Sequence, residues 1–122
     1  MRSRTWVEVD AAALRANLRL FRQLVGLNTQ IAPVIKANAY GHGTRAVVQS
    51  LVKEPFWGFC VASGDEALAL RALTKRKIVV LSSWERPDLP ALVKQDIQLV
   101  AWDLSSAQTI NRVAGRIGRR AS

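Results

Sequence analysis

The sequence predicts an α/β fold in which helices cross over a parallel sheet. Short apolar runs bounded by turn residues are typical of buried strands. Segments with apolar residues at helical spacing follow these runs. The runs begin at intervals of about 20 to 25 residues, which is the rhythm of strands joined by helices. Because a complete eight-stranded barrel needs roughly 250 residues, four such units fit either an open sheet or half a barrel.

Length and composition indicate one globular domain. The chain has 122 residues, of which 49% are hydrophobic and 22% charged, and this balance excludes a disordered protein. No apolar run is long enough to span a bilayer, and no apolar signal core follows the basic residues 1–5. We therefore expect a cytoplasmic protein with no membrane partner. The single cysteine, Cys60, lies in an apolar run and is expected to be a buried, unreactive thiol.

The strongly basic charge raises the question of nucleic-acid binding. The net charge is +9, from 18 Lys and Arg against 9 Asp and Glu. The arginines are spread along the chain rather than gathered in one aromatic-rich block. Two denser groups, residues 75–77 and 116–120, are typical of a solvated turn and a chain end. We expect no nucleic-acid partner.

The first elements are a strand and an amphipathic helix. Residues 5–9 alternate and are β-prone, so we expect a short strand. Asp10 is a good N-cap for the helix that follows. The apolar residues of that helix recur at helical spacing: Leu14, Leu18, Phe21 and Val25.

The stretch from residue 31 to residue 43, IAPVIKANAYGHG, carries the main chemical signal. Residues 31–35 read as a buried strand, in which Pro33 removes one ladder donor. Lys36 follows at the carboxyl end, where parallel α/β folds bind ligands. An amine at such a position suits Schiff-base chemistry. The residues alone leave a second interpretation open, because most lysines at strand ends are solvated rim charges.

Three more strand–helix units follow this stretch. A short helix begins at Thr44. Counted from residues 31–35 as the first barrel-type strand, residues 56–62 form the second. Residues 63–66 have the S-x-x-E form of a capping box, so we expect Ser63 and Glu66 to bind each other's backbone N–H groups.

The last part of the chain follows the same rhythm. Residues 78–81 are aliphatic without alternation, which is typical of a strand covered on both faces. Residues 82–90 form a loop, and residues 91–94 are helical. Residues 97–102 form the fourth strand, and Asp103 caps the last helix.

The run VIKANAYGHG, residues 34–43, resembles residue for residue the signature of the alanine racemase family, whose lysine carries pyridoxal 5′-phosphate as a Schiff base. Weaker matches are WVEVD at residues 6–10 and WGFCVAS at residues 57–63. The resemblance implies the first half of a (β/α)8 TIM-type barrel, with about four parallel βα units preceded by a short strand and helix. It assigns residues 1–122 to the N-terminal part of the cofactor-binding barrel domain, without the C-terminal β domain.

The same resemblance implies a reaction and a set of site residues. The reaction is the interconversion of L-alanine and D-alanine, which supplies D-alanine for cell-wall peptidoglycan. Lys36 would hold the cofactor and act as base for the D enantiomer, and Tyr40 would hydrogen-bond the cofactor phosphate. Val34 and Leu81 match cofactor-pocket positions, although plain core explains them equally well. His42 is expected to fix its turn without catalysing, and no metal is implied.

The family's remaining catalytic groups fall outside the pattern that this chain matches. These groups are the opposite-face tyrosine, the histidine that stacks under the cofactor ring, the substrate- and cofactor-binding arginines and the phosphate-binding loop. We therefore expect the chain to be inactive alone. The family implies a homodimer, and a second chain that supplies the missing half is possible. Alternatives are a racemase for serine or broader substrates, a non-catalytic cofactor-binding module, and a remnant half-barrel that pairs through an exposed edge.

Overall fold

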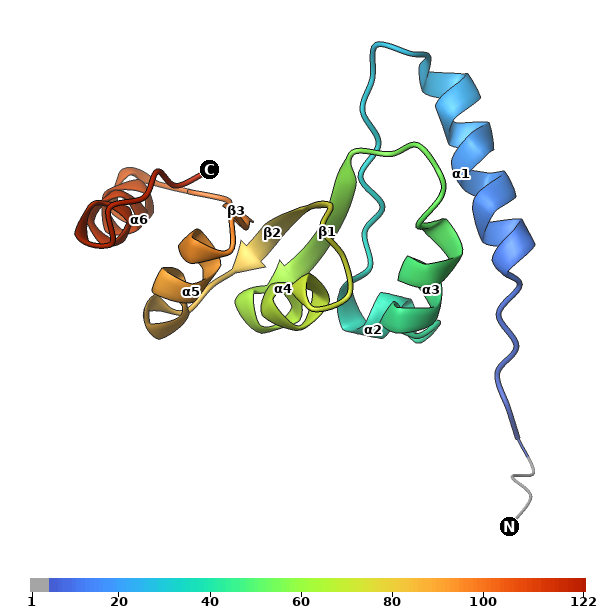
Figure 1. Ribbon diagram of the computed structural model, residues 1–122, viewed down its shortest axis with the longest axis horizontal. Helices are drawn as coiled ribbons and strands as arrows, with labels where there is room; N and C mark the ends of the chain where they lie inside the picture. The colour runs from blue at the N-terminus through green and yellow to red at the C-terminus, as the bar shows by residue number, and fades with distance from the viewer. Residues whose placement is uncertain (1–4) are drawn as a thin grey trace.

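The computed structural model describes residues 5–122 as three helices followed by strands and helices in turn, which confirms the predicted α/β class (Figure 1). The elements follow one another from α1 at one end of the molecule to α6 at the other. In chain order they are α1 (Ala11–Val25), α2 (Lys36–Tyr40), α3 (Thr44–Leu51), β1 (Gly58–Ser63), α4 (Gly64–Arg71), β2 (Lys77–Ser83), the 3₁₀ helix η1 (Arg86–Asp88), α5 (Leu89–Lys94), β3 (Gln98–Leu99) and α6 (Leu104–Arg116).

The three strands form a parallel sheet in the order β1-β2-β3. Gly58 pairs with Lys77, and a Cβ at residue 58 would clash with the Lys77 carbonyl oxygen, so only glycine fits this close approach. The register shifts between Val61 and Ser63, which leaves Ala62 without a partner on β2. The sheet is therefore irregular at the carboxyl end of β1.

Residues 31–35 run alongside β1 but form less of a strand than predicted. The segment has a single parallel bridge, between Val34 and Cys60. The Cys60 N–H donates to the Pro33 carbonyl and the Ile35 N–H donates to the Cys60 carbonyl, both at 2.9 Å. Pro33 has no N–H to give to this ladder, as expected. The predicted position of this segment is right, although its pairing is shorter than a full strand.

The short strand predicted at residues 5–9 is wrong. These residues have no regular secondary structure, and Trp6 and Val7 are 74% and 78% exposed. A β-prone segment needs a neighbouring backbone with which to exchange hydrogen bonds. Within residues 5–122, no bridge or strand pairing includes these residues.

The core lies between the sheet and its helices. On β2, Ile78 and Val80 are fully buried, and α4 packs against β1 and β2. Leu81 is 41% exposed, so within the described residues the helices cover one face of this strand. The prediction that this strand is covered on both faces is therefore wrong for the part of the chain described.

Side chains cap the helices largely where predicted. The Asp10 carboxylate accepts hydrogen bonds from the first turn of α1, and Asp103 forms a full capping box with Ser106. Ser63 Oγ accepts from the Glu66 N–H at 3.3 Å, which is only half of the predicted reciprocal box. The Glu66 carboxylate binds other backbone groups instead, as described below.

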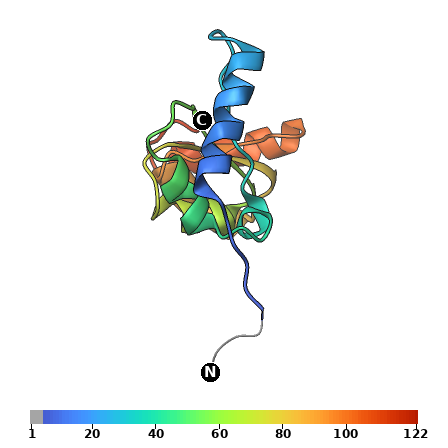
Figure 2. The same cartoon turned by 90° about the vertical axis from the view of Figure 1, so that its right-hand side faces the viewer.

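Helix α1 packs against α3 and is tied to the turn after α3 by an ion pair. Arg19 Nε and Nη2 donate to the two Glu54 oxygens at 2.9 and 2.7 Å. These hydrogen bonds lower the pKa of Glu54 and raise that of Arg19. The carboxyl-terminal end of α1 projects beyond the rest of the fold (Figure 2). Within residues 5–122, no helix combines the length and the apolar character needed to cross a bilayer.

Candidate functional site

Lys36 lies where the predicted strand ends, at the carboxyl-terminal edge of the parallel sheet. It is half-buried and begins α2 directly after the segment that pairs with β1. Its Nζ lies over the ring of Tyr40, 6.0 Å from the ring centre. The structure therefore brings together the two residues that carry the strongest predictions for a site.

The turn that joins these two residues is left-handed. Residues 37–40 have φ values of 50°, 53°, 54° and 53°. A left-handed helical conformation costs about 1–2 kcal/mol for each L-residue with a Cβ. Strain of this kind persists only where surrounding contacts hold it, and it clusters at functional sites. Asn38 is the only residue in this turn that favours such a conformation, so the left-handed turn was not predictable from the local residue types.

Hydrogen bonds stabilise the carboxyl-terminal end of this turn. The Gly43 N–H donates to the Asn38 carbonyl at 2.9 Å, and Asn38 Oδ1 accepts from the Thr44 N–H at 2.9 Å. His42 Nδ1 donates to the Ala39 carbonyl at 2.8 Å. His42 thus helps to fix the turn, as expected.

A carboxylate binds the backbone at the amino-terminal end of the turn. Glu66 Oε1 accepts from the Ala37 N–H at 2.7 Å, and Oε2 accepts from the Ala62 N–H at 2.8 Å. The residue next to Lys36 is therefore bound to the end of β1 through the first turn of α4. Sequence reasoning missed this contact. The S-x-x-E motif marked Glu66 but pointed to the wrong backbone partner.

Val34 and Leu81 share the sheet face that the helices leave uncovered. Their neighbours Ile35 and Val80 are buried, whereas Val34 is 39% and Leu81 is 41% exposed. Because successive side chains of a strand point to opposite faces, both residues point away from the buried face. Their role as lining of a cofactor site stays a prediction.

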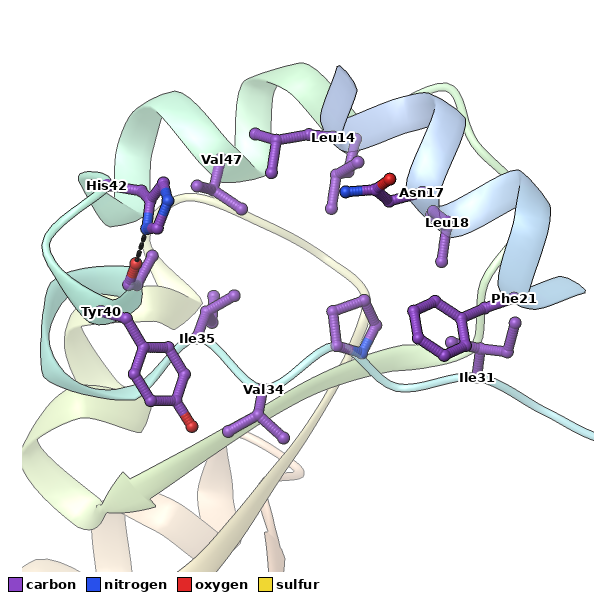
Figure 3. A pocket seen from close by; sticks show the side chains of 13 residues that line it. Leu14, Asn17, Leu18, Phe21, Ile31, Val34, Ile35, Tyr40, His42 and Val47 are labelled. Atoms are coloured by element: carbon purple, nitrogen blue, oxygen red, sulfur yellow. Dashed lines mark hydrogen bonds between the residues drawn. The ribbon is translucent and has the colours of Figure 1, made fainter. Parts of the chain in front are cut away.

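A separate apolar pocket lies between α1 and residues 31–35. Its volume is about 420 Å³, and α2 and α3 close it on the other side (Figure 3). Tyr40 and Val34 are part of its lining, but Lys36 is not. Its other lining residues are Leu14, Asn17, Leu18, Phe21, Ile31, Pro33, Ile35, Ala39, His42, Val47 and Leu51. The pocket therefore borders the Lys36 site without containing its amine.

The single thiol and the acidic residues add no further chemistry here. Cys60 is buried in β1, and this burial raises the pKa of its thiol, which disfavours the nucleophilic thiolate. Within residues 5–122, no cluster of three or more His, Cys, Asp or Glu side chains could hold a metal ion.

Comparison with known proteins connects this geometry to one family. Residues 9–122 match the family model described as "Alanine racemase, N-terminal domain". An alanine racemase of Listeria monocytogenes is 38% identical over 100 residues, which is 80% of this chain and 27% of the relative. One of Synechocystis is 34% identical over 121 residues, which is 98% of this chain and 32% of the relative.

A solved structure agrees with these relatives. Alanine racemase of Clostridium difficile superposes with a TM-score of 0.83 at 33% identity, over 88% of this chain and 28% of that protein. This chain thus spans 27% to 32% of the length of these proteins. The match of residues 9–122 to the family model shows that the chain belongs to the alanine racemase family.

Proposed function

We propose that this chain is the lysine-bearing part of a pyridoxal 5′-phosphate-dependent alanine racemase, which interconverts L-alanine and D-alanine. The observation that carries the proposal is the pairing of the Lys36 amine with the Tyr40 ring, 6.0 Å apart, on a strained turn at the carboxyl edge of a parallel sheet. Membership of the alanine racemase family supports the same reaction.

The residues present fit this cofactor. Pyridoxal 5′-phosphate offers an aldehyde, an aromatic ring and a phosphate. The half-buried Lys36 provides a primary amine for the aldehyde, and Tyr40, 60% exposed, provides a phenol O–H for the phosphate. Val34 and Leu81 provide apolar surface for the ring. When bound, the cofactor supplies an electron sink for a carbanion at the substrate Cα.

Each residue then has a defined task. Lys36 would hold the cofactor through its Nζ, and the free amine would move a proton at the substrate Cα on the face for the D enantiomer. The Tyr40 hydroxyl would donate a hydrogen bond to the cofactor phosphate. Val34 and Leu81 would exclude water from one side of the bound ring.

Racemisation needs proton transfer on both faces of Cα, and the Lys36 amine serves one of them. This chain covers 27% to 32% of the length of its relatives. We assign the group that moves the proton on the opposite face to the rest of that length, in the same protein or in a partner subunit. In this proposal, residues 1–122 are the N-terminal part of the cofactor-binding domain of a homodimeric cytoplasmic enzyme. Its product would supply D-alanine for peptidoglycan.

An absorbance titration tests the proposal. The purified chain is titrated with pyridoxal 5′-phosphate, and the absorbance band of the lysine-bound cofactor is followed. We expect a saturable band in the wild-type chain and in Lys53→Ala, which removes an exposed lysine. We expect Lys36→Ala to lose the band. A band that is equally strong in Lys36→Ala would overturn the proposal.

Proton exchange separates a racemase part from a non-catalytic cofactor-binding module. The loaded chain is incubated in D₂O with D-alanine or L-alanine, and deuterium at Cα is measured by mass spectrometry. Because Lys36 serves one face, we expect exchange into D-alanine to be faster than into L-alanine, with little net racemisation. A loaded chain that exchanges neither enantiomer would favour the binding module.

A further inference from the structure

We propose that Glu66 is a positioning residue that sets the place of Lys36 and Tyr40 by ending the pairing between residues 31–35 and β1. The inference rests on the proposed function for its consequence, although the structural role of Glu66 can be tested without the cofactor. The contacts that carry it are the two backbone N–H groups, of Ala37 and Ala62, that one carboxylate binds.

A regular ladder would have continued where Glu66 lies. Val34 bridges Cys60, so the next pair along two parallel strands would be Lys36 with Ala62. In that pair the Ala62 N–H would donate to the Ile35 carbonyl, and the Ala37 N–H would donate to the Ala62 carbonyl. Instead both N–H groups donate to the Glu66 carboxylate, and the Ile35 carbonyl accepts from the Ala39 N–H.

The carboxylate therefore separates the two segments at the residue that bears the amine. Because the Ala37 N–H is satisfied by Glu66, the backbone after Lys36 is free to enter the left-handed turn. That turn carries Tyr40 back toward the Lys36 Nζ. Without Glu66, continued pairing with β1 competes with the strained turn.

The helix that bears Glu66 is held in place by its N-cap and by its packing on the sheet. Glu66 lies in the first turn of α4, and its own N–H donates to the N-cap hydroxyl of Ser63. The next residues of α4 that face the sheet, Ala67 and Leu70, are almost completely buried. The position of the carboxylate is thus fixed by the packing of α4 on the sheet.

The geometry requires an acidic side chain in particular. A carboxylate presents two acceptor oxygens and no donor, which matches two N–H groups. A glutamine keeps one acceptor oxygen and directs an N–H at the other backbone N–H. Glu66→Gln therefore removes one contact while it preserves the size of the side chain.

Backbone amide exchange in the wild-type chain and in Glu66→Gln tests, without cofactor, whether the Glu66 carboxylate holds the Ala37 and Ala62 N–H groups. A hydrogen bond to a charged group typically contributes 10-fold or more to an equilibrium, so we expect protection of the Ala37 and Ala62 amides to fall by about 10-fold. Asp65→Asn, on the exposed side of the same helical turn, should leave both amides unchanged. If Glu66→Gln does not fold, protection of the same two amides is measured in Glu66→Asp. Its side chain keeps the charge but is shorter, so we expect the same loss of protection.

Cofactor labelling tests the positioning. Each variant is treated with pyridoxal 5′-phosphate and borohydride, and label on Lys36 is compared with label on the other four lysines. We expect Glu66→Gln to lower the Lys36 label by about 10-fold and to leave the other lysines unchanged. Glu54→Gln is the matched control, because it removes a bidentate carboxylate that holds α1 and not the turn. It should lower the melting temperature and preserve the Lys36 label.

Two results would overturn the inference. One is a folded Glu66→Gln or Glu66→Asp chain in which Ala37 protection and Lys36 labelling stay within about twofold of wild type. The other is an equal loss of Lys36 label in Glu54→Gln, because general loosening would then explain the effect. A wild-type chain that takes no label on Lys36 would contradict the proposed function instead, and amide exchange would still decide whether Glu66 holds the turn.

Discussion

The Lys36 Nζ lies 6.0 Å from the centre of the Tyr40 ring, at the two ends of one left-handed turn. This distance is at the outer limit of a cation–π contact, so it orients the amine without enclosing it. The phenol is 60% exposed, and its hydroxyl is therefore free to contact a ligand held by the amine. This relationship leads to a prediction for the tyrosine.

Replacing Tyr40 by phenylalanine should weaken cofactor binding and leave the fold intact. The ring that faces the amine is kept, but the proposed donor to the phosphate is lost. A hydrogen bond to a charged group is worth about 1.5–3 kcal/mol, so we expect affinity for pyridoxal 5′-phosphate to fall by about 10-fold or more. An absorbance titration measures the change. Trp102→Phe, an exposed aromatic change that follows β3 at the opposite edge of the sheet, is the control. Unchanged affinity in Tyr40→Phe would contradict the assignment.

Glycine at residue 37 should be tolerated because the left-handed backbone favours it. Ala37 has φ 50° and is exposed, so Ala37→Gly should leave the free energy of unfolding unchanged or raise it by up to about 1 kcal/mol. The matched change Ala16→Gly, on an exposed position within α1, should lower it by about 1 kcal/mol. Urea unfolding measures both. Equal destabilisation by the two changes would mean that the turn is not left-handed in solution.

The ion pair between Arg19 and Glu54 should make stability depend on pH. Hydrogen bonds from Arg19 lower the pKa of Glu54 in the folded chain. The stabilisation is therefore present above the ordinary glutamate pKa of about 4.3, and it is lost as the pH falls through the lower folded pKa.

Urea unfolding of wild type and Glu54→Gln at pH 7, 5, 4 and 3 checks this dependence. We expect the variant to be less stable at pH 7 and the difference to shrink toward pH 3. Glu85→Gln, at an exposed glutamate, should follow the wild-type curve. A difference between wild type and Glu54→Gln that is constant from pH 7 to pH 3 would exclude the pair as its source.

The Cys60 thiol should react slowly with Ellman's reagent until the chain unfolds. The thiol is buried in β1, and burial raises its pKa, so both access and ionisation are low. Raising the pH from 7 to 9 should increase the reaction rate of the thiol in the urea-unfolded chain, where its pKa is about 8.5. The same change should increase the rate in the native chain far less. A native thiol that reacts as fast as the unfolded one would show that β1 is not packed as described.

Local signals in the sequence predicted much of this fold. The N-caps Asp10, Ser63 and Asp103 all lie at the predicted helix starts, because a cap depends on a few neighbouring residues. Residues 31–35 lie beside β1 as expected, because an apolar run at this point has few other places to be buried. The predicted strand at residues 5–9 does not form, because a strand depends on a neighbouring strand that a local pattern does not supply.

The candidate site was only partly predictable for the same reason. Lys36 and Tyr40 were identified from a contiguous motif. The contact between Glu66 and Ala37 joins residues 29 apart in the sequence, and the S-x-x-E pattern favoured a local partner instead. The left-handed turn lacks a glycine at residues 37–40, so the contacts that stabilise it are visible only in three dimensions.

The location of the bound cofactor tests the role of Lys36 most directly. The wild-type chain is incubated with pyridoxal 5′-phosphate, reduced with borohydride, digested and analysed by mass spectrometry. Five lysines compete for the label. We predict that Lys36 carries most of it at low cofactor excess, because this amine lies beside the Tyr40 phenol on a held turn. Equal labelling of the exposed lysines and Lys36 would show that Lys36 is not a selective site for the cofactor.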